Sequence, residues 1–169
     1  QVVDTSGEFI SHKFIAENIE PINYEPNSPP IENFLETVTV STSDNWDLYV
    51  NWEKALLKDA FATGREVKEK AEKLTKDETT TLGKINKIFS FVAQEIRYQQ
   101  EYENTIAGVK PHTAAQTLER GYGDCKDKAV LFIQLAKEIS LNVDYVILRT
   151  KDAGRFQKKI PNQQFNHAI

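Results

Sequence analysis

The single cysteine of the chain lies in a segment whose residue types could support nucleophilic chemistry. Residues 121–128 read Gly-Tyr-Gly-Asp-Cys-Lys-Asp-Lys and lead into the apolar run 129–133. Asp124 is a favourable N-cap residue, and Asp127 follows three residues later, where it can complete a capping box. The pattern therefore predicts Cys125 in the first turn of a buried helix. Unpaired N–H groups and the helix dipole favour a thiolate there.

A buried thiol that only packs is the alternative role for Cys125, and it is the usual role of a lone cysteine in a folded domain. The neighbours of Cys125 argue against this role, because Asp124, Lys126, Asp127 and Lys128 are all charged. The two aspartates disfavour a thiolate and the two lysines favour one. The sequence leaves the sign of their combined effect open.

A cysteine nucleophile needs a base that accepts its proton and a further group that orients the base. The chain has three histidines. We expect His12 at the surface of the N-terminal segment, whereas His112 precedes a short predicted helix near the cysteine. Two adjacent strands after the cysteine helix could bring His167 to the thiol. A metal site of Cys125, His112 and His167 is a weaker hypothesis, because zinc needs three or four close ligands and no short Cys/His spacing is present.

Composition narrows the class of protein. A chain of 169 residues, with 40% hydrophobic and 27% charged residues, fits one main globular domain with room for part of a second. The net charge of −4 argues against a general nucleic-acid binder. One cysteine allows no internal disulfide. No apolar run approaches the roughly 18 residues of a membrane span, so no transmembrane segment is expected.

The N-terminal quarter of the chain differs from the rest in composition. Residues 1–44 contain eight acidic residues and a single basic one, Lys13. Residues 1–42 read as extended structure with four prolines, and the alternation of apolar residues with threonines over residues 34–42 predicts a strand. We interpret residues 1–42 as the C-terminal part of a preceding β-rich module, or as an arm that packs on the helices.

The elements that must position Cys125 and His167 are a run of helices followed by strands. A helix capped by Ser43 or Asp44, a highly charged helix after Gly64, and a helix with an apolar stripe over residues 82–96 come first. A Thr113-capped helix over residues 114–120, ending at Gly121, and the cysteine helix to about residue 140 follow. Residues 142–150 predict a strand, residues 151–161 a basic hairpin-like loop, and residues 164–169 the start of another strand.

Four blocks of the chain resemble the bacterial transglutaminase-like superfamily. They are Tyr98, the Pro-His-Thr-Ala run 111–114, the Gly-Tyr-Gly-Asp-Cys-Lys-Asp-Lys-Ala run 121–129, and the Phe-Asn-His-Ala-Ile run 165–169. The last seven residues of the third run are the most specific part. The resemblance covers roughly residues 45–169 and implies an α+β fold over residues 43–169. In this papain/transglutaminase-like core the nucleophile stands at the N-terminus of a central helix packed on an antiparallel sheet.

The resemblance implies a Cys-His-Asp triad in which Cys125 is the nucleophile and His167 the base. The implied activity is acyl transfer on a peptide-like amide of a peptide or protein substrate, without a cofactor. The Cys125 N–H would donate to the oxyanion, and Tyr98 or Tyr122 could supply a second donor or only pack at the cleft rim. Hydrolysis by a cysteine protease or amidase is favoured over crosslinking. A non-catalytic binding or scaffold module on the same fold is the alternative.

No residue of the chain matches the aspartate of the triad, because Asp144 and Asp152 both precede His167. We therefore expect a domain truncated at its C-terminus, which as a fragment could be inactive. Its open sheet edge would be free to pair with a second chain. The resemblance points weakly to a periplasmic, cell-surface or secreted protein of a bacterium.

The loop over residues 151–159 carries four basic residues ahead of His167. We predict that this loop borders the cleft and favours acidic substrates, and a solvated loop is the simpler alternative.

Overall fold

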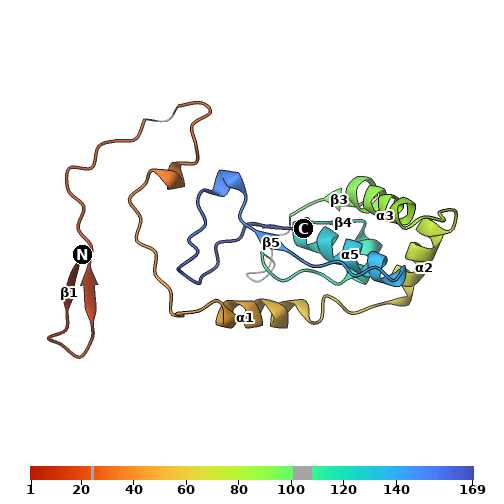
Figure 1. The fold of residues 1–169 in the computed structure, drawn as a ribbon, viewed down its shortest axis with the longest axis horizontal. Helices are drawn as coiled ribbons and strands as arrows, with labels where there is room; N and C mark the ends of the chain where they lie inside the picture. The colour runs from red at the N-terminus through yellow and green to blue at the C-terminus, as the bar shows by residue number, and fades with distance from the viewer. Residues whose placement is uncertain (24, 101–107) are drawn as a thin grey trace.

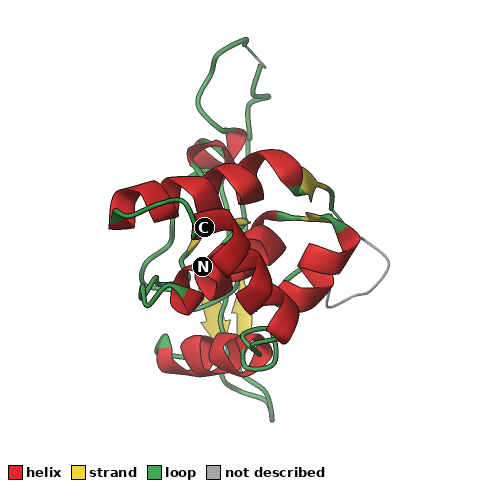
Figure 2. Ribbon diagram, turned by 90° about the vertical axis from the view of Figure 1, so that its right-hand side faces the viewer, coloured by secondary structure: helices red, strands yellow, loops and turns green. Residues whose placement is uncertain are grey.

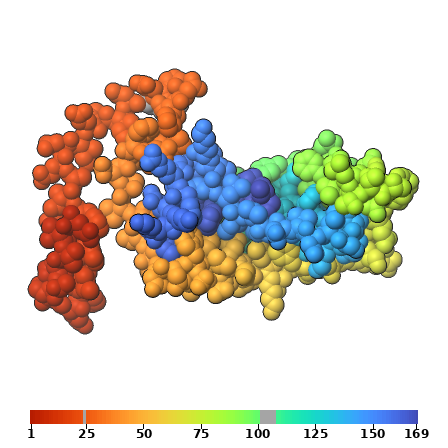
Figure 3. Space-filling model, viewed as in Figure 1, coloured from red at the N-terminus to blue at the C-terminus, as the bar shows by residue number. Residues whose placement is uncertain are grey.

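A computed structural model describes residues 1–23, 25–100 and 108–169 of the chain. A thin N-terminal segment stands apart from a helical body (Figure 1), and the space-filling view shows the same separation (Figure 3). In chain order the elements are β1 (Val2–Asp4), β2 (Ser11–Lys13), the 3-10 helix η1 (Ile31–Asn33), α1 (Asp47–Leu57), α2 (Arg65–Thr75), α3 (Thr81–Ser90), the π-helical turn η2 (Phe91–Glu95), β3 (Arg97–Tyr98), α4 (Ala114–Arg120), β4 (Tyr122–Gly123), α5 (Cys125–Glu138), β5 (Ile147–Leu148), the 3-10 helix η3 (Lys151–Ala153) and β6 (His167–Ala168).

Helix α5 is the centre of the packing. It contacts α2, α3, α4 and β6, and its side chains Val130, Leu131 and Leu135 are completely buried. Val67 of α2 and Ile88 of α3 meet them in one hydrophobic core. Full burial of one such side chain stabilises the fold by about 1.5–3 kcal/mol. Helices form most of the body and the strands are short (Figure 2), so the fold is α+β, as the sequence predicts.

Replacing Leu131 by alanine is expected to lower the free energy of unfolding by about 2–5 kcal/mol, because the change opens a cavity in this core. Chemical denaturation of the two chains measures the difference. Leu82→Ala on α3 is the matched control, because Leu82 is 67% exposed. The control is expected to change stability by less than about 0.5 kcal/mol. Equal losses for both variants would contradict the central position of α5.

Two predicted helix ends are confirmed in detail. The Thr113 side chain accepts a hydrogen bond from the Gln116 N–H, and Gln116 reaches back to the Thr113 N–H, so α4 begins with a capping box. Gly121 ends α4 in the left-handed region with φ 69°, a conformation that glycine adopts without steric cost. Helix α5 begins directly after this turn and β4, which places its first residue close to the end of α4.

Other helix boundaries differ from the prediction. Helix α1 begins at Asp47 rather than directly after the predicted caps, because the Asn45 side chain accepts from the Asp47 N–H and the Ser43 hydroxyl bonds Asn45 instead. The apolar stripe over residues 82–96 passes from α3 into a π-helical turn. Phe89 is 61% exposed, and Leu82 is exposed as well, so the stripe is only partly core.

The strands of the body form two small ladders. Strands β3 and β4 pair in parallel, with Tyr98 opposite Gly123. Strands β5 and β6 pair antiparallel, with Leu148 opposite His167. The predicted strand over residues 142–150 is reduced to β5, because a ladder forms only where β6 lies alongside it. The antiparallel sheet against α5 is therefore a two-stranded ribbon in the described part of the chain.

The N-terminal segment contains a hairpin of β1 and β2, but residues 34–42 form no strand. Val38 is 54% exposed and Val40 is 75% exposed. A strand needs a partner, and no described strand runs beside this stretch. The segment touches the body through Ser41, whose hydroxyl donates to the Pro161 carbonyl, and through Asn33, whose side chain accepts from the Arg155 N–H.

No helix among the described residues has the length and apolar character needed to cross a membrane.

Candidate active site

The site is organised around the start of α5, where the predicted capping box is present. The Asp124 side chain accepts from the N–H groups of Lys126, at 3.2 Å, and of Asp127, at 3.4 Å. The Asp127 carboxylate accepts from the Asp124 N–H at 3.2 Å. These reciprocal bonds hold the first turn of the helix in one geometry. Cys125 is the first residue of α5, at the end of the helix where the dipole is positive.

Three charged residues beside Cys125 are paired with other groups of the protein. The Lys126 ammonium pairs with the Asp124 carboxylate, and their side chains are only 7% and 9% exposed. The Asp127 carboxylate accepts from the His112 N–H at 2.8 Å and lies 3.2 Å from the His112 ring. Each aspartate thus has its own partners. Asp124 and Lys126 pair with each other, and Asp127 is bound to His112.

Gly123 allows strand β4 to lie close to this turn. A Cβ atom at position 123 would stand 2.6 Å from the Asp127 Cβ atom, which is too close for any side chain. Gln99, the residue after β3, donates a backbone hydrogen bond to the Gly123 carbonyl of β4 at 3.1 Å. This pairing brings Tyr98, the partner of Gly123 in the ladder, to the start of α5.

Tyr98 is in contact with Cys125. Burial raises the pKa of Tyr98, and the charges of Cys125 and Asp124 and a hydrogen bond with the Cys125 side chain raise it further. A hydrogen bond with the Cys125 backbone acts in the opposite direction. Tyr98 and Cys125 also line the same apolar pocket. Tyr98 is 54% exposed, and Cys125 is partly buried.

Tyr122, the second candidate for the cleft, has different surroundings. Its ring faces the guanidinium groups of Arg97, at 5.7 Å, and of Arg120, at 5.9 Å. Tyr122 does not line either of the two pockets at Cys125. The structure thus brings Tyr98 to the pocket at the thiol and places Tyr122 between two arginines outside both pockets.

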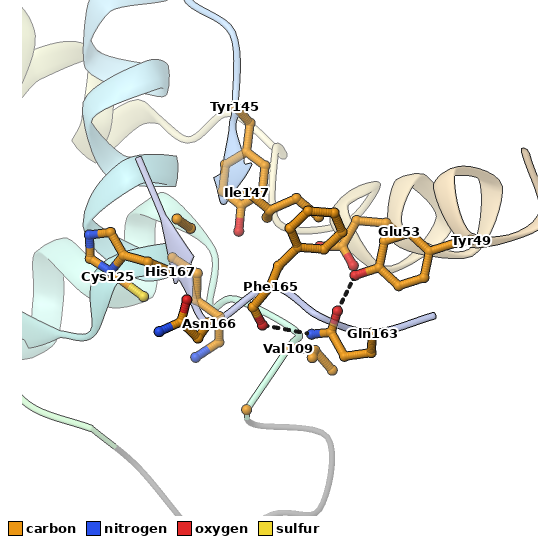
Figure 4. Close-up of a pocket in the computed structure, with 13 residues that line it drawn as sticks. Tyr49, Glu53, Val109, Cys125, Tyr145, Ile147, Gln163, Phe165, Asn166 and His167 are labelled. Atoms are coloured by element: carbon orange, nitrogen blue, oxygen red, sulfur yellow. Dashed lines mark hydrogen bonds between the residues drawn. The ribbon is translucent and has the colours of Figure 1, made fainter. Parts of the chain in front are cut away.

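His167 reaches the site from strand β6. The β5–β6 register is held on both sides of the histidine. The Asn166 side chain exchanges hydrogen bonds with Thr150, at 2.9 Å and 2.7 Å, and Ile169 exchanges backbone bonds with Val146, both at 2.9 Å. Figure 4 shows the His167 ring at the same end of a pocket as the Cys125 sulfur. A shift of one residue in this register would turn His167 to the opposite face of the ribbon.

Cys125 and His167 lie at the boundary of two pockets, and both residues line each of them. The first pocket, drawn in Figure 4, has an empty volume of about 400 Å³ and extends toward α1, where Tyr49 and Glu53 form its wall. The second pocket is mainly apolar and extends between α3 and α5, past Phe132. A molecule that reaches the sulfur therefore has room on both sides of it.

No described carboxylate is hydrogen-bonded to the His167 ring. Asp144 is exposed and lines the apolar pocket, and Asp152 lies in η3, where Thr150 hydrogen-bonds its carboxylate and lowers its pKa. Neither residue orients the histidine. Among the described residues no group of three metal-ligating side chains comes together, and His112, bound to Asp127, lines neither pocket.

The basic loop of residues 151–159 does not border the pockets at Cys125, contrary to the prediction. It packs instead on an aromatic cluster of α1 and the C-terminal segment. The Lys158 carbonyl accepts from the Trp46 indole N–H at 2.9 Å, and the Phe156 ring lies 5.5 Å from the Trp46 ring. Ring contacts and this hydrogen bond hold the loop against α1, away from the pockets.

Sequence reasoning missed Glu53 and Tyr145, which both line the first pocket. A signal for Glu53 was present, since it lies four residues after Tyr49 and four before Leu57. Residues at this spacing share one face of a helix, so a glutamate stands in the middle of the buried face of α1. The signal for Tyr145 was weaker, because the predicted strand gave no indication of which face meets α1.

A cysteine at a helix start and a histidine on a strand thus line the same two pockets. The family model of the transglutaminase-like superfamily matches residues 68–168, from the first turn of α2 to the last residue of β6. The chain belongs to the transglutaminase-like superfamily, whose chemistry is in general cysteine-based acyl transfer. No curated protein and no solved structure matches the chain. Helix α1 lies outside the matched residues.

Proposed function

We propose that the chain catalyses acyl transfer on a peptide-like amide, with Cys125 as nucleophile and His167 as base. The observation that carries the proposal is the position of these two side chains at one pocket boundary, on elements that the family model spans. The substrate class is a peptide or protein amide. Hydrolysis is the favoured outcome over crosslinking, because Cys125 is only partly buried and water is by far the most abundant nucleophile that can reach it.

In the proposed reaction His167 accepts the proton of the Cys125 thiol, and the sulfur attacks the amide carbonyl carbon. The C–N bond then breaks, and the protonated imidazole returns its proton to the departing amine. The thioester that remains is attacked by water, which releases a carboxylic acid and restores the thiol. Attack by an amine in place of water would form a new amide.

The oxyanion of the tetrahedral intermediate would accept from the Cys125 backbone N–H, with the Tyr98 hydroxyl as second donor. The contact of Tyr98 with both the side chain and the backbone of Cys125 supports this role. One donor of this kind is worth about 2.7–4 kcal/mol of transition-state stabilisation.

The second candidate function is a binding or scaffold module without catalysis. It is favoured by the absence of a hydrogen-bonded carboxylate at His167 within the described residues. We also propose that residues 1–42 are the last part of a β-rich module, since their hairpin lies apart from the helical body.

The rate of Cys125 alkylation by iodoacetamide tests the two functions against each other. Only the thiolate reacts, and a free cysteine with a pKa of about 8.5 is almost entirely protonated at pH 6. If His167 activates the thiol, Cys125 is expected to react at pH 6 at least about tenfold faster than free cysteine. A rate at or below that of free cysteine would reject the enzyme and leave the binding module.

A further inference from the structure

Glu53 is a buried carboxyl group on the pocket wall opposite the thiol. It is 8% exposed and projects from α1 into the first pocket (Figure 4). No described residue donates a hydrogen bond to its carboxylate or forms an ion pair with it. Its carboxylate oxygens keep some accessible surface, which faces the pocket, so a ligand can reach them. A carboxyl group that is partly desolvated on folding and gains no partner within the chain is a candidate for a functional site.

The surroundings of Glu53 indicate the kind of ligand. The aromatic rings of Tyr49, Tyr145 and Phe165 line the same pocket, and the rings of Tyr49 and Phe165 stand 5.6 Å apart. The Tyr49 hydroxyl donates to the Gln163 side chain, which fixes its ring in the wall. Aromatic faces attract cations, and a carboxylate among them adds a full opposite charge. This combination suits an ammonium group and suits neither an anion nor a purely apolar group.

The other charges of the pocket leave Glu53 available. Lys126 also lines the pocket, but its ammonium is paired with Asp124. Glu53 is the only carboxylate among the described lining residues, and His167 lies at the far end beside Cys125. Burial raises the pKa of Glu53. Burial also raises the pKa of Tyr145, and the charges of Glu53 and Cys125 raise it further. Tyr145 thus lies within electrostatic reach of both ends of the pocket.

From these contacts we propose that Glu53 is a specificity-determining residue that binds an ammonium group of the substrate while its carbonyl is at Cys125. This proposal rests on the proposed function, because it takes Cys125 as the residue that reacts with the substrate carbonyl. Helix α1 lies outside residues 68–168, so the family match gives no role to this wall of the pocket. The favoured substrates are therefore amides with a lysine-like cationic group, and acidic amides are disfavoured.

The test uses three chloroacetamides that differ only at the end of the tail. N-(4-aminobutyl)-2-chloroacetamide carries an ammonium, N-pentyl-2-chloroacetamide a methyl group at the same place, and N-(4-carboxybutyl)-2-chloroacetamide a carboxylate. The Cys125 sulfur displaces chloride and forms an S–C bond, so each reaction is followed as a mass increase at the only cysteine. The parent chain is expected to react about tenfold faster with the ammonium probe than with the methyl probe, and slowest with the carboxylate probe.

Glu53→Gln is expected to bring the ratio of the ammonium and methyl rates close to one. Asp47→Asn is the matched control, because it removes the same charge from an exposed position of α1 and is expected to keep the parent ratio. A ratio near one in the parent chain, or an unchanged ratio in Glu53→Gln, would overturn the proposal. The reaction with iodoacetamide is measured in parallel. A slow iodoacetamide reaction with a ratio that still depends on Glu53 would reject the proposed function and keep the ammonium site.

Two reactants could carry the ammonium group, namely the acyl donor and an amine that resolves the thioester. The second source is tested with the thioester formed from p-nitrophenyl acetate, to which 1,4-diaminobutane is added, so that one nitrogen attacks the thioester as a free amine while the other can bind Glu53 as an ammonium. If Glu53 binds the resolving amine, Glu53→Gln lowers the ratio of N-(4-aminobutyl)acetamide to acetate, and this supports the site as an acceptor site. If Glu53→Gln leaves the product ratio unchanged but removes the preference for the ammonium chloroacetamide, the site binds the acyl donor.

Thermal unfolding provides a readout that needs no reaction. Because burial raises the pKa of Glu53, the folded chain holds this proton more tightly than the unfolded chain. The carboxyl group therefore favours folding at low pH and loses that contribution as the pH rises through the raised value. Glu53→Gln is expected to have a higher Tm than the parent at pH 7 and an equal one at pH 4. A lower Tm at pH 7 would show that the carboxylate has a partner within the chain, and would overturn the proposal.

Discussion

With alanine in place of Cys125, the chain is expected to lose acyl transfer from p-nitrophenyl acetate by a factor on the order of 10⁴ or more. The physical reason is that the covalent step itself disappears, because no other thiol exists in the chain. The parent chain should gain an acetyl group at Cys125, and the variant should gain none. Intact-protein mass spectrometry and the release of p-nitrophenol measure the two sides of the same reaction.

The matched control for this result is Cys125→Ser, which keeps the shape of the side chain but replaces the thiol with a much weaker nucleophile. It is expected to be folded and almost as inactive as the alanine variant. If either variant still forms p-nitrophenol at the parent rate, the ester is opened elsewhere on the protein. That result would exclude Cys125 as nucleophile.

Replacing His167 by alanine is expected to slow acetylation of Cys125 at pH 6 by about 10²–10⁴-fold, the usual contribution of a general base. The cause is the loss of the proton acceptor at the end of the pocket where the sulfur lies. The deficit is expected to shrink as the pH rises toward 9, since hydroxide then ionises the thiol without help. Stopped-flow measurement of p-nitrophenol release between pH 5.5 and pH 9 gives the profile.

His112→Ala is the discriminating control for the base. His112 is bound to Asp127 and Arg120 and lies outside both pockets, so its loss should leave the pH profile in place. A profile that changes with His112 rather than His167 would reverse the assignment. A purely structural role of His167 would lower the rate equally at every pH, and the convergence at high pH separates the two cases.

Local signals in the sequence were sufficient for the helices that carry the site. The capping boxes at Thr113 and Asp124, and the glycine that ends α4, involve residues no more than four positions apart. The side chains that make these contacts are therefore already near one another before folding is complete. For the same reason the α+β class and the family could be predicted from runs of a few residues around Cys125 and His167.

Contacts between distant segments could not be predicted from the sequence alone. The alternation over residues 34–42 predicts a strand, but a strand exists only where a partner lies beside it, and the described chain places none there. The basic loop of residues 151–159 was predicted at the cleft and lies instead on the aromatic cluster around Trp46. In both cases the local sequence is compatible with the predicted structure. Whether that structure forms depends on the contacts that a distant segment can make with it.

The sequence by itself determined that Cys125 begins a capped helix, because the groups that build the cap are its immediate neighbours. Only the tertiary structure decided that Tyr98 lies against the thiol, that Asp124 is paired with Lys126, and that α1 closes one pocket with a buried glutamate. The physical reason is that burial and pairing are properties of surroundings. Glu53 is one acidic residue among many along the chain, and it becomes distinctive only when α1 packs against the segment that leads into β6.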